Sequence, residues 1–528
     1  MSSTHILVFP FPAQGHMIPL LDFTDQIIRS RNAGEITITI LVTPKNLPLL
    51  NQILSVHPSI QTLVLPFPSS SSIPLGAENA KDLKPSSALA MIRAVVTPKN
   101  LPLLNQILSV HPSIQTLVLP FPSSYSIPLG VENAKDSTSD LAMMRAVGGL
   151  HDPLIKWFRS HPSPPVAILS DMFLGWTHRL AADLGIRRIV FSPSGALALS
   201  VMFSMWRDLP TRRDPNDQNE VVSFGGVPNC PKYPWWQLSP LYRSYVEGDP
   251  DGEFFRDAFL DNLASWGLVV NSFGDLEGVY LEHLRKETGH IRVWAVGPVK
   301  PIEQSGPTTR GGPSSVSADS ITSWLDKCDD LKVVYVCFGT QAVLSNDEME
   351  ALALGLERSG VRFVWSIKEP AEAHVEGGYG RVPQGFDDRV AGRGLVIKGW
   401  APQVLILNHR AVGAFLTHCG WNSVLESVTT GVPILAWPMG ADQFINAALL
   451  DQLKLAIRVC EGEETVSDSV DLARVLVESV REDDRAERQR AKQLREAALR
   501  ATVNGGSSVK DVESFIVHLV ALGVATCK

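Results

Sequence analysis

The residues most suited to chemistry lie in the segment GAFLTHCGWNSVLES, residues 413–427. An apolar run there stops at Thr417, and an amphipathic stretch typical of a helix starts at Trp421, with Gly420 permitting a tight turn between them. Main-chain amides at the start of such a helix have no partner within it, and together with the helix dipole they attract a phosphate group. The junction therefore predicts an anion-binding site.

Polar side chains around this junction extend the predicted site. His418, Asn422 and Ser423 add hydrogen-bond donors. Glu426 follows Ser423 by three residues and Asn422 by four, so it lies on the same helical face, where a carboxylate suits the paired hydroxyls of a ribose. The segment alone leaves an alternative open, namely an ordinary strand–helix junction in which Asn422 and Ser423 act as caps.

Two flanking motifs favour a nucleotide sugar as the ligand. The motif WAPQ begins with Trp400, whose indole can stack on a base, and ends with Gln403, which can read the edge of that base. The motif WPMGADQ ends in Asp442 and Gln443, an acceptor-rich pair suited to sugar hydroxyls. Groups for base, ribose, phosphate and sugar thus fall within residues 400–443.

Strand patterns alternate with helix patterns along the chain, which indicates α/β architecture with parallel sheets covered on both faces. The expected strands are 5–11, 36–42, 165–171 and 187–194 in the first half and 332–340, 361–368, 393–400, 411–417 and 432–438 in the second. Ser345 and Glu348 form a capping-box signature for one helix start. A stretch rich in Pro, Gly and Ser, residues 297–317, predicts a linker between domains 1–296 and 318–505.

Ligands of parallel sheets bind at the carboxyl ends of the strands, and the first half places two titratable residues there. His16 lies in the turn after the first strand, and Asp171 ends another strand of the same sheet. An imidazole titrates near neutrality and can take a proton from a hydroxyl, while a neighbouring carboxylate can stabilise the imidazolium. A lone loop histidine is more often an ordinary surface or core residue, so the local pattern leaves both interpretations open.

Residues 400–443 resemble the signature segment of the plant secondary-product UDP-glycosyltransferases of family 1, which have the GT-B fold. The segments FPFPAQGHMIPLLDF and WAVGP are also similar to this family, especially to its flavonol-type glucosyltransferase branch. The resemblance implies two Rossmann-like, doubly wound domains that face a cleft. It also implies that a last helix, within residues 506–528, crosses back to the first domain.

By position, the resemblance implies where the nucleotide would bind. Trp400 would stack on uracil, with Ala401 and Gln403 at the edge of the base, and Glu426 would bind the ribose.

The resemblance likewise implies a diphosphate site. His418, Asn422 and Ser423 would bind the diphosphate, and Thr340, in the motif CFGT, would approach a phosphate.

The sugar and the reaction follow from the same resemblance. Trp421, Asp442 and Gln443 would hold the sugar, and Trp421 with a terminal Gln443 resembles the glucose-using members. His16, oriented by Asp171, would deprotonate an acceptor hydroxyl, which attacks the anomeric carbon while UDP leaves from the opposite face. One displacement inverts the anomeric configuration, with UDP-glucose as donor substrate and no cofactor or metal.

A metal-dependent alternative comes from GDPDG, residues 248–252, because Asp249 and Asp251 formally make a D-x-D motif. Gly and Pro surround this motif and no apolar strand leads into it, so we interpret it as a surface turn.

The sequence gives weaker evidence for the acceptor pocket than for the donor site. Aromatic and apolar side chains of the first half suit a flat phenolic acceptor, although each of them fits a core position equally well. These candidates are Met172, Phe173, Met202, Phe203, Trp206, Trp235 and Trp236.

Composition excludes several other classes of protein. The length of 528 residues predicts two domains, and the net charge of -8 argues against nucleic acid or an anionic membrane as partner. The six cysteines lie far apart without metal-ligand spacing, so a cytoplasmic, reducing compartment is expected. The N-terminus lacks the basic start of a signal peptide, and no apolar stretch predicts stable membrane insertion. A monomer is expected.

One feature does not fit the family pattern, a tandem duplication with copies at 42–95 and 96–147. From 42–82 to 96–136 the copies differ at two positions, Ser71 against Tyr125 and Ala77 against Val131, so the duplication is recent or an error in the recorded sequence. Each copy contains a helix-like segment and a strand, and either could fill the same position in the sheet. We interpret the surplus copy as silent or harmful.

Two further functions remain as alternatives. A UDP-sugar-binding protein of low or no activity would result if the duplication perturbs the acceptor domain. A dinucleotide-dependent oxidoreductase is less favoured, because the first strand leads into AQGHM and not into G-x-G-x-x-G.

Overall fold

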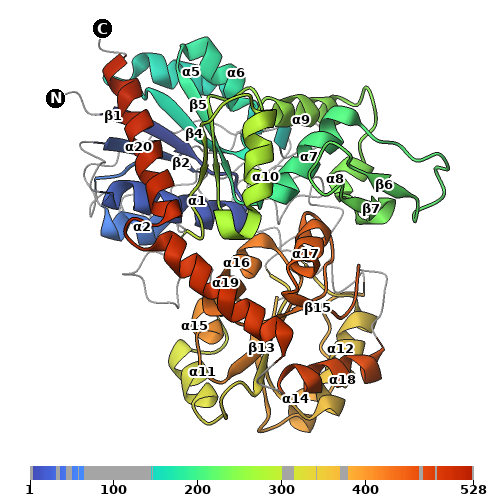
Figure 1. The fold of residues 1–528 in the computed structure, drawn as a ribbon. Helices are drawn as coiled ribbons and strands as arrows, with labels where there is room; N and C mark the ends of the chain where they lie inside the picture. Colours follow the sequence, from blue (N-terminus) through green and yellow to red (C-terminus); the bar gives the residue numbers. More distant parts are fainter. Residues whose placement is uncertain are drawn as a thin grey trace, which may run out of the picture.

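The computed structural model describes residues 4–30, 36–42, 50–57, 59–64, 144–145, 147–299, 314–339, 342–368, 378–462, 468–481 and 485–525. Within these ranges the chain forms two parallel sheets, each with helices packed on both faces, and a last helix that returns to the first sheet (Figure 1). Thr340, most of the linker and most of the duplicated region lie outside the described residues.

The first sheet has seven described strands, and every neighbouring pair is parallel. In sheet order they are β3 (Gln61–Val64), β2 (Ile36–Val42), β1 (Thr4–Phe9), β4 (Ala167–Asp171), β5 (Arg187–Ser192), β8 (Gly267–Val270) and β9 (Val293–Ala295). Along β1, Leu7 and Phe9 enter one apolar core while Ile6 and Val8 enter another. Both faces of the strand are therefore buried, as its continuous apolar run predicts.

Helices from distant parts of the chain cover the two faces of this sheet (Figure 1). One face carries α1 (Gln14–Arg29), α2 (Asn51–Val56) and α20 (Ser507–Ala525). The other carries α5 (His151–Ser160), α6 (Thr177–Leu184), α7 (Ala196–Asp208), α9 (Pro250–Leu260) and α10 (Gly274–Glu287). A short hairpin, β6 (Val221–Ser223) with β7 (Lys232–Pro234), continues into the one-turn helix η6 (Trp235–Gln237) and then α8 (Pro240–Arg243).

The second sheet has six described strands, also parallel throughout. Their order is β12 (Gly394–Lys398), β11 (Arg362–Ile367), β10 (Val333–Cys337), β13 (Val412–Thr417), β14 (Ile434–Ala436) and β15 (Ala456–Arg458). The helices around it are α11 (Ala318–Leu325), α12 (Asn346–Ser359), α14 (Phe386–Arg389), α15 (Gln403–Leu407), α16 (Trp421–Thr430), α17 (Gln443–Gln452), α18 (Ser469–Ser479) and α19 (Ala486–Thr502). The capping box predicted at Ser345 and Glu348 is present and starts α12.

Helix α20 leaves the second domain through α19 and packs on the first sheet, as expected (Figure 1). Asp511 accepts a hydrogen bond from the main-chain amide of Ala295 (2.7 Å), and Phe515 is fully buried against Phe23 and Trp294. The first domain thus has a core that is completed by the last described helix. The residue boundaries of the domains stay a prediction.

The first copy of the duplicated segment fills the edge of the first sheet. It provides α2 and β3, and β3 pairs with β2 from Thr39 opposite Gln61 to Val42 opposite Val64. His57 of this copy contacts the buried carboxylate of Asp25 on α1 (2.5 Å). The sequence could not choose between the two copies, because they are nearly identical. The corresponding part of the second copy lies outside the described residues.

No helix within the described ranges is both long and apolar enough to pass through a bilayer.

Candidate active site

The structure brings His16 and Asp171 into direct contact, although they lie far apart in the sequence. His16 is in the first turn of α1, and Asp171 is the last residue of β4, the strand next to β1. The distance from His16 Nδ1 to Asp171 Oδ2 is 2.9 Å, with exposed side-chain fractions of 18% and 0%. When Nδ1 donates to the carboxylate, Nε2 is the nitrogen that can accept a proton.

Both members of this pair are held by their surroundings. Asp171 Oδ1 accepts the main-chain amide of Phe173 (2.9 Å) at the start of the one-turn helix η5 (Met172–Leu174). The rings of Phe11 and Phe173 lie 5.4 Å and 4.7 Å from the His16 ring. These contacts fix the plane of the imidazole and leave it partly exposed.

The second domain approaches the base directly. Asn422, in the first turn of α16, donates a hydrogen bond from Nδ2 to the main-chain oxygen of Gly15 (2.9 Å), the residue before His16. The predicted diphosphate site and the predicted base are therefore neighbours.

The predicted phosphate site is a helix N-terminus with a specialised backbone. Helix α16 follows Gly420 without a side-chain cap, and Cys419 just before it has a left-handed φ of 63°. A Cβ atom on Gly420 or on Gly339 would lie 2.6 Å from His418 Nε2, so the imidazole packs against the backbone at both positions. Burial lowers the pKa of His418 to about 4, which keeps it neutral near pH 7. A neutral imidazole and free amide ends can still donate to a phosphate oxygen.

On the nucleotide side, three predicted residues form one hydrogen-bond network. Gln403 donates from Nε2 to Glu426 Oε2 (2.7 Å) and to Ser423 Oγ (3.0 Å). Its Oε1 accepts from the hydroxyl of Tyr335 (3.2 Å), on β10. Gln403, the predicted contact to the base, is thus hydrogen-bonded to Glu426, the predicted contact to the ribose. Trp400, the predicted stacking partner of the base, is half-buried.

The predicted sugar-binding pair lies at the start of α17, next to the first domain. Gln443 Oε1 accepts the main-chain amides of Met439 (2.9 Å) and Gly440 (3.0 Å), which folds the loop back on itself. Asp442 accepts a hydrogen bond from Ser194 Oγ (2.9 Å), and burial raises the pKa of Asp442. The nearby His16 acts on this pKa in the opposite direction, so the side chains of Asp442 and His16 share one electrostatic environment.

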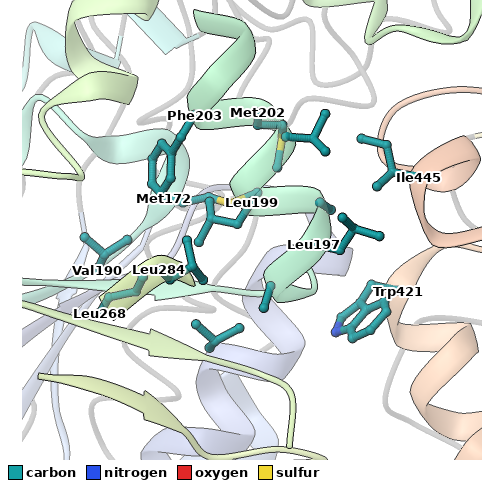
Figure 2. Packing of buried hydrophobic residues seen from close by; sticks show 14 of the residues in the cluster. Met172, Val190, Leu197, Leu199, Met202, Phe203, Leu268, Leu284, Trp421 and Ile445 are labelled. Atoms are coloured by element: carbon teal, nitrogen blue, oxygen red, sulfur yellow. The ribbon is translucent and has the colours of Figure 1, made fainter. Parts of the chain in front are cut away.

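Trp421 lies at the interface between the two domains. Its side chain is 4% exposed, and Nε1 donates to the main-chain oxygen of Asn271 (2.7 Å). The indole packs in an apolar cluster that includes Leu197 of α7 and Ile445 of α17 (Figure 2). A contact between this side chain and a sugar stays a prediction, while its main-chain amide belongs to the α16 terminus.

Sequence reasoning missed Ser194 and Asn271, which both contact the second domain. They follow strands β5 and β8 at the same carboxyl edge as Asp171. The strand-end rule points to such positions, but a neutral serine and asparagine give no titration signal to single them out.

Comparisons with known proteins fit this geometry. The family model described as UDP-glucoronosyl and UDP-glucosyl transferase matches residues 316–485. A flavonol 3-O-glucosyltransferase of Arabidopsis thaliana is 52% identical over 524 residues, which cover 99% of this chain and 98% of that protein. The chain belongs to the UDP-glycosyltransferase family. UDP-glycosyltransferase 89B2 of Stevia rebaudiana is 51% identical, with 98% of each chain covered.

Solved structures confirm the predicted GT-B fold of this UDP-glycosyltransferase. The crystal structure of Arabidopsis thaliana UGT89C1 complexed with UDP-L-rhamnose has a TM-score of 0.71 at 36% identity, covering 98% of this chain and 100% of that one. The same protein complexed with quercetin has a TM-score of 0.69 at 35% identity, with the same coverage. The predicted resemblance to the flavonol branch of the plant family is confirmed.

The acceptor candidates of the transferase separate by burial. Met172, Phe203 and Trp206 are at most 2% exposed and belong to the core, and Met202 is 9% exposed. Phe173, Trp235 and Trp236 remain half-buried. Because Phe173 also packs against His16, it is the candidate nearest the predicted base.

The structure corrects the interpretation of GDPDG as a surface turn. Asp249 is the N-cap of α9 and accepts from the Gly252 amide (2.8 Å), with Pro250 as the first helical residue. Asp251 pairs with Arg145 (2.9 Å). Both carboxylates therefore have structural roles. Within the described ranges, no group of three or more His, Cys, Asp or Glu side chains is arranged to hold a metal ion.

Proposed function

We propose that this enzyme transfers glucose from UDP-glucose to a hydroxyl of a small phenolic acceptor of the flavonoid type, with inversion at the anomeric carbon. The observation that carries the proposal is the His16–Asp171 contact beside the start of α16 and beside Asp442. A base, an anion site and a sugar-binding carboxylate then converge from two domains.

Proton transfer in this mechanism belongs to the first domain. His16 Nε2 takes the proton of the acceptor hydroxyl while its oxygen forms a bond to the anomeric carbon. Asp171 accepts the Nδ1 proton in a hydrogen bond and stabilises the imidazolium that results. The bond between the anomeric carbon and the phosphate oxygen breaks, and its electron pair leaves with UDP.

Stabilisation of the leaving group belongs to the second domain. The amides at the start of α16, the neutral imidazole of His418 and the side chains of Asn422 and Ser423 face the developing charge as fixed donors. The proposed mechanism assigns no step to a metal ion. Thr340, proposed to approach a phosphate, lies outside the described residues.

Glucose is proposed as the sugar on two grounds. The relative with 52% identity is named a glucosyltransferase, and Gln443 occupies the terminal position typical of glucose-using members. A relative with 37% identity is named a flavonol 7-O-rhamnosyltransferase, so UDP-L-rhamnose is the competing donor. Both relatives are named as transferases that act on flavonols, which supports a flavonoid-type acceptor.

The cellular setting is part of the proposal. We propose a monomer in the cytoplasm. The described cysteines, Cys230, Cys328, Cys337, Cys419 and Cys460, form no disulfide, which suits a reducing compartment, and the net charge of -8 argues against nucleic acid as partner.

The decisive experiment is a matrix of UDP-sugars against flavonols and simpler phenols, with products identified by mass spectrometry and their anomeric configuration by NMR. We expect β-glucosides from UDP-glucose at the highest kcat/KM. Preferred use of UDP-L-rhamnose would overturn the donor assignment, and an α-linked product would overturn the inverting mechanism. Binding of UDP-glucose without any product would favour the low-activity alternative.

A further inference from the structure

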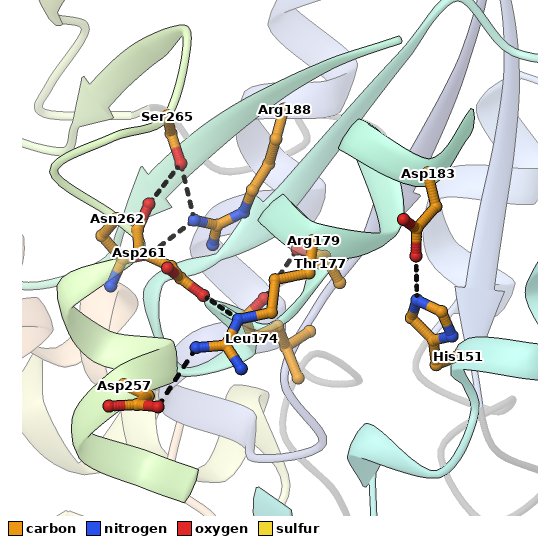
Figure 3. Close-up of polar contacts among 10 residues, drawn as sticks. All are labelled: His151, Leu174, Thr177, Arg179, Asp183, Arg188, Asp257, Asp261, Asn262 and Ser265. Carbon is orange, nitrogen blue, oxygen red and sulfur yellow. Dashed lines mark hydrogen bonds and ion pairs between the residues drawn. The ribbon is translucent and has the colours of Figure 1, made fainter. Parts of the chain in front are cut away.

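A fully buried arginine lies behind the proposed catalytic carboxylate. Arg188, on β5, is 1% exposed. Its guanidinium donates to Ser170 Oγ (3.0 Å), Asn262 Oδ1 (2.7 Å), Ser265 Oγ (2.9 Å) and the main-chain oxygen of Asp171 (3.2 Å). Figure 3 shows this guanidinium pointing to Asn262 and Ser265. All four acceptors are uncharged oxygens.

These hydrogen bonds hold the turn that follows β4. The main-chain oxygen of Asp171 accepts from Arg188, and that of Met172 accepts from Asn262 Nδ2 (2.9 Å). Gly175, just beyond the turn, lies so close to α9 that a Cβ atom there would meet a main-chain oxygen at 1.5 Å. The segment carrying the catalytic carboxylate is therefore fixed from beneath by side chains that no substrate reaches.

The charge of Arg188 is also placed to act on Asp171. An isolated buried cation is costly, and the four hydrogen bonds of Arg188 offset the cost of its desolvation. Burial lowers the pKa of Arg188 to about 9, while the charges of Asp261 and Asp171 act in the opposite direction. The guanidinium thus remains charged at neutral pH, behind a carboxylate that is 0% exposed.

The other ionisable groups nearby do not duplicate this role. Asp261 pairs with Arg179 (2.9 Å), which is 55% exposed, and burial raises the pKa of Asp261. Burial lowers the pKa of His178, so it is neutral at neutral pH. His16 also lies near enough to Asp442 to lower the pKa of that carboxyl, against the effect of burial.

We propose that Arg188 is a positioning residue of the transferase, whose buried charge and hydrogen bonds hold Asp171 in place so that His16 stays correctly oriented as a base. The inference rests on the proposed roles of His16 and Asp171. Arg188 touches neither substrate and acts through the turn and through its electric field.

The sign of the effect on pH dependence follows from electrostatics. Loss of a nearby positive charge makes it easier for the His16–Asp171 pair to take up a proton, whichever residue holds it. The inactive, protonated form then persists to higher pH. The acid limb of kcat/KM, which reports the free enzyme, therefore moves to higher pH when the charge is removed.

The test compares two variants. Arg188→Met removes the charge and the hydrogen bonds, whereas Arg188→Lys keeps the charge but lacks the planar guanidinium that makes the four hydrogen bonds. For Arg188→Met we expect the acid limb to move up by about one pH unit and kcat to fall about 10- to 100-fold. For Arg188→Lys we expect a lower kcat with the limb near its original position. UDP affinity, measured by calorimetry, stays unchanged in both because the nucleotide site lies in the other domain.

Two further variants keep the inference testable if Arg188→Met does not fold. Asn262→Asp places a carboxylate against Arg188 and opposes its charge, so the acid limb again moves up, and loss of the hydrogen bond to Met172 should lower kcat as well. Arg179→Met is the matched control, because Arg179 contacts Asp257 and Asp261 at the surface and not the catalytic turn (Figure 3). We expect a wild-type profile for it.

The outcomes separate this inference from the proposed function. If His16→Ala is inactive while Arg188→Met, or Asn262→Asp in its place, keeps the wild-type limb and kcat, Arg188 is structural only and the inference fails. If His16→Ala retains activity, the assignment of the base fails instead. An equal shift in Arg179→Met would show that the effect is a general change in surface charge.

Discussion

The two domains contribute to one site by different physical means. In the first domain the site consists of ionisable groups in contact, His16 against Asp171 with Arg188 behind them. In the second domain the predicted phosphate site consists of main-chain amides and the neutral imidazole of His418, while the carboxylates of Glu426 and Asp442 lie at the predicted ribose and sugar positions. In the proposed mechanism the first group changes its protonation during the reaction, whereas the phosphate site presents the same field to every donor molecule.

This difference between the domains matches the chemistry proposed for each of them. A carboxylate in contact with an imidazole stabilises the imidazolium that forms when the base takes up a proton, which suits proton transfer from an acceptor. Fixed dipoles need no reorganisation when charge develops on a leaving diphosphate. The following predictions test whether proton transfer and donor binding can be separated in this way.

The largest expected effect comes from His16→Ala. Removal of the base should lower kcat about 10²- to 10⁴-fold, while the Kd for UDP stays within experimental error. Asp171→Asn should lower kcat by a smaller factor. Steady-state kinetics and calorimetry check both quantities, and a His16→Ala enzyme with more than about a tenth of wild-type turnover would exclude this residue as the base.

The duplicated segment provides a matched pair of stability tests in the first domain. Leu54 is 3% exposed in the core between α2 and the sheet, and Leu108 is its counterpart in the second copy. Leu54→Ala should lower the free energy of unfolding by about 2–5 kcal/mol, because it leaves a cavity. Leu108→Ala should leave it unchanged. Denaturant unfolding with the reverse ranking would assign the sheet position to the second copy.

In the second domain, a single methyl group tests the donor site. Gly420→Ala would place Cβ 2.6 Å from His418 Nε2, which should displace the imidazole and weaken UDP binding by about tenfold or more. Gly274→Ala is the control, because a Cβ there at the start of α10 meets no atom within 4 Å. Equal UDP affinity in the two variants would remove His418 from the phosphate site.

Asp442→Ala and Gln443→Ala should separate sugar recognition from nucleotide recognition. Each removes a group proposed to hold the sugar, so KM for UDP-glucose should rise about tenfold. Inhibition by UDP, which has no sugar, should hardly change. A parallel loss of UDP affinity would instead show that the loop folded by Gln443 supports the nucleotide.

The smallest effect concerns the dependence of stability on pH. Burial lowers the pKa of His418 in the second domain and of His5 in the first from 6.5 to about 4. As the pH falls from about 6.5 to 4, the unfolded chain takes up protons that the folded chain does not, so stability declines. His418→Gln and His5→Gln should each flatten this decline in denaturant unfolding, and an unchanged slope would contradict the burial of that imidazole as a neutral group.

The sequence was sufficient where local pattern decides the structure. Continuous apolar runs located the buried strands, and the Ser345 capping box marked the start of α12. His16 and Asp171 were predicted to meet because parallel strands end at one edge of a sheet. The helix start at Asp249-Pro250 was missed, although Asp before Pro is a recognised N-cap pattern.

The sequence was insufficient where distant partners decide the structure. From the sequence, Trp421 is predicted only to start a helix. Its burial depends on contacts with α7 and with Asn271, which belong to the other domain. The sequence shows Arg188 only as a charged residue at the start of a strand, and its four acceptors come from two distant segments, β4 and the loop after α9. The two copies of the repeat have nearly the same local energies, so their environment alone distinguishes them.

Helix α20 has a consequence for the order in which the enzyme assembles at the ribosome. The strands of the first sheet emerge early, yet Phe515, Ile516 and Leu519, all fully buried against that sheet, are synthesised after the whole second domain. Domains usually fold as units in the order of synthesis, and here that order is interrupted. The nascent first domain exposes an apolar face throughout translation of the second, so chaperone binding during synthesis should centre on that face until α20 arrives.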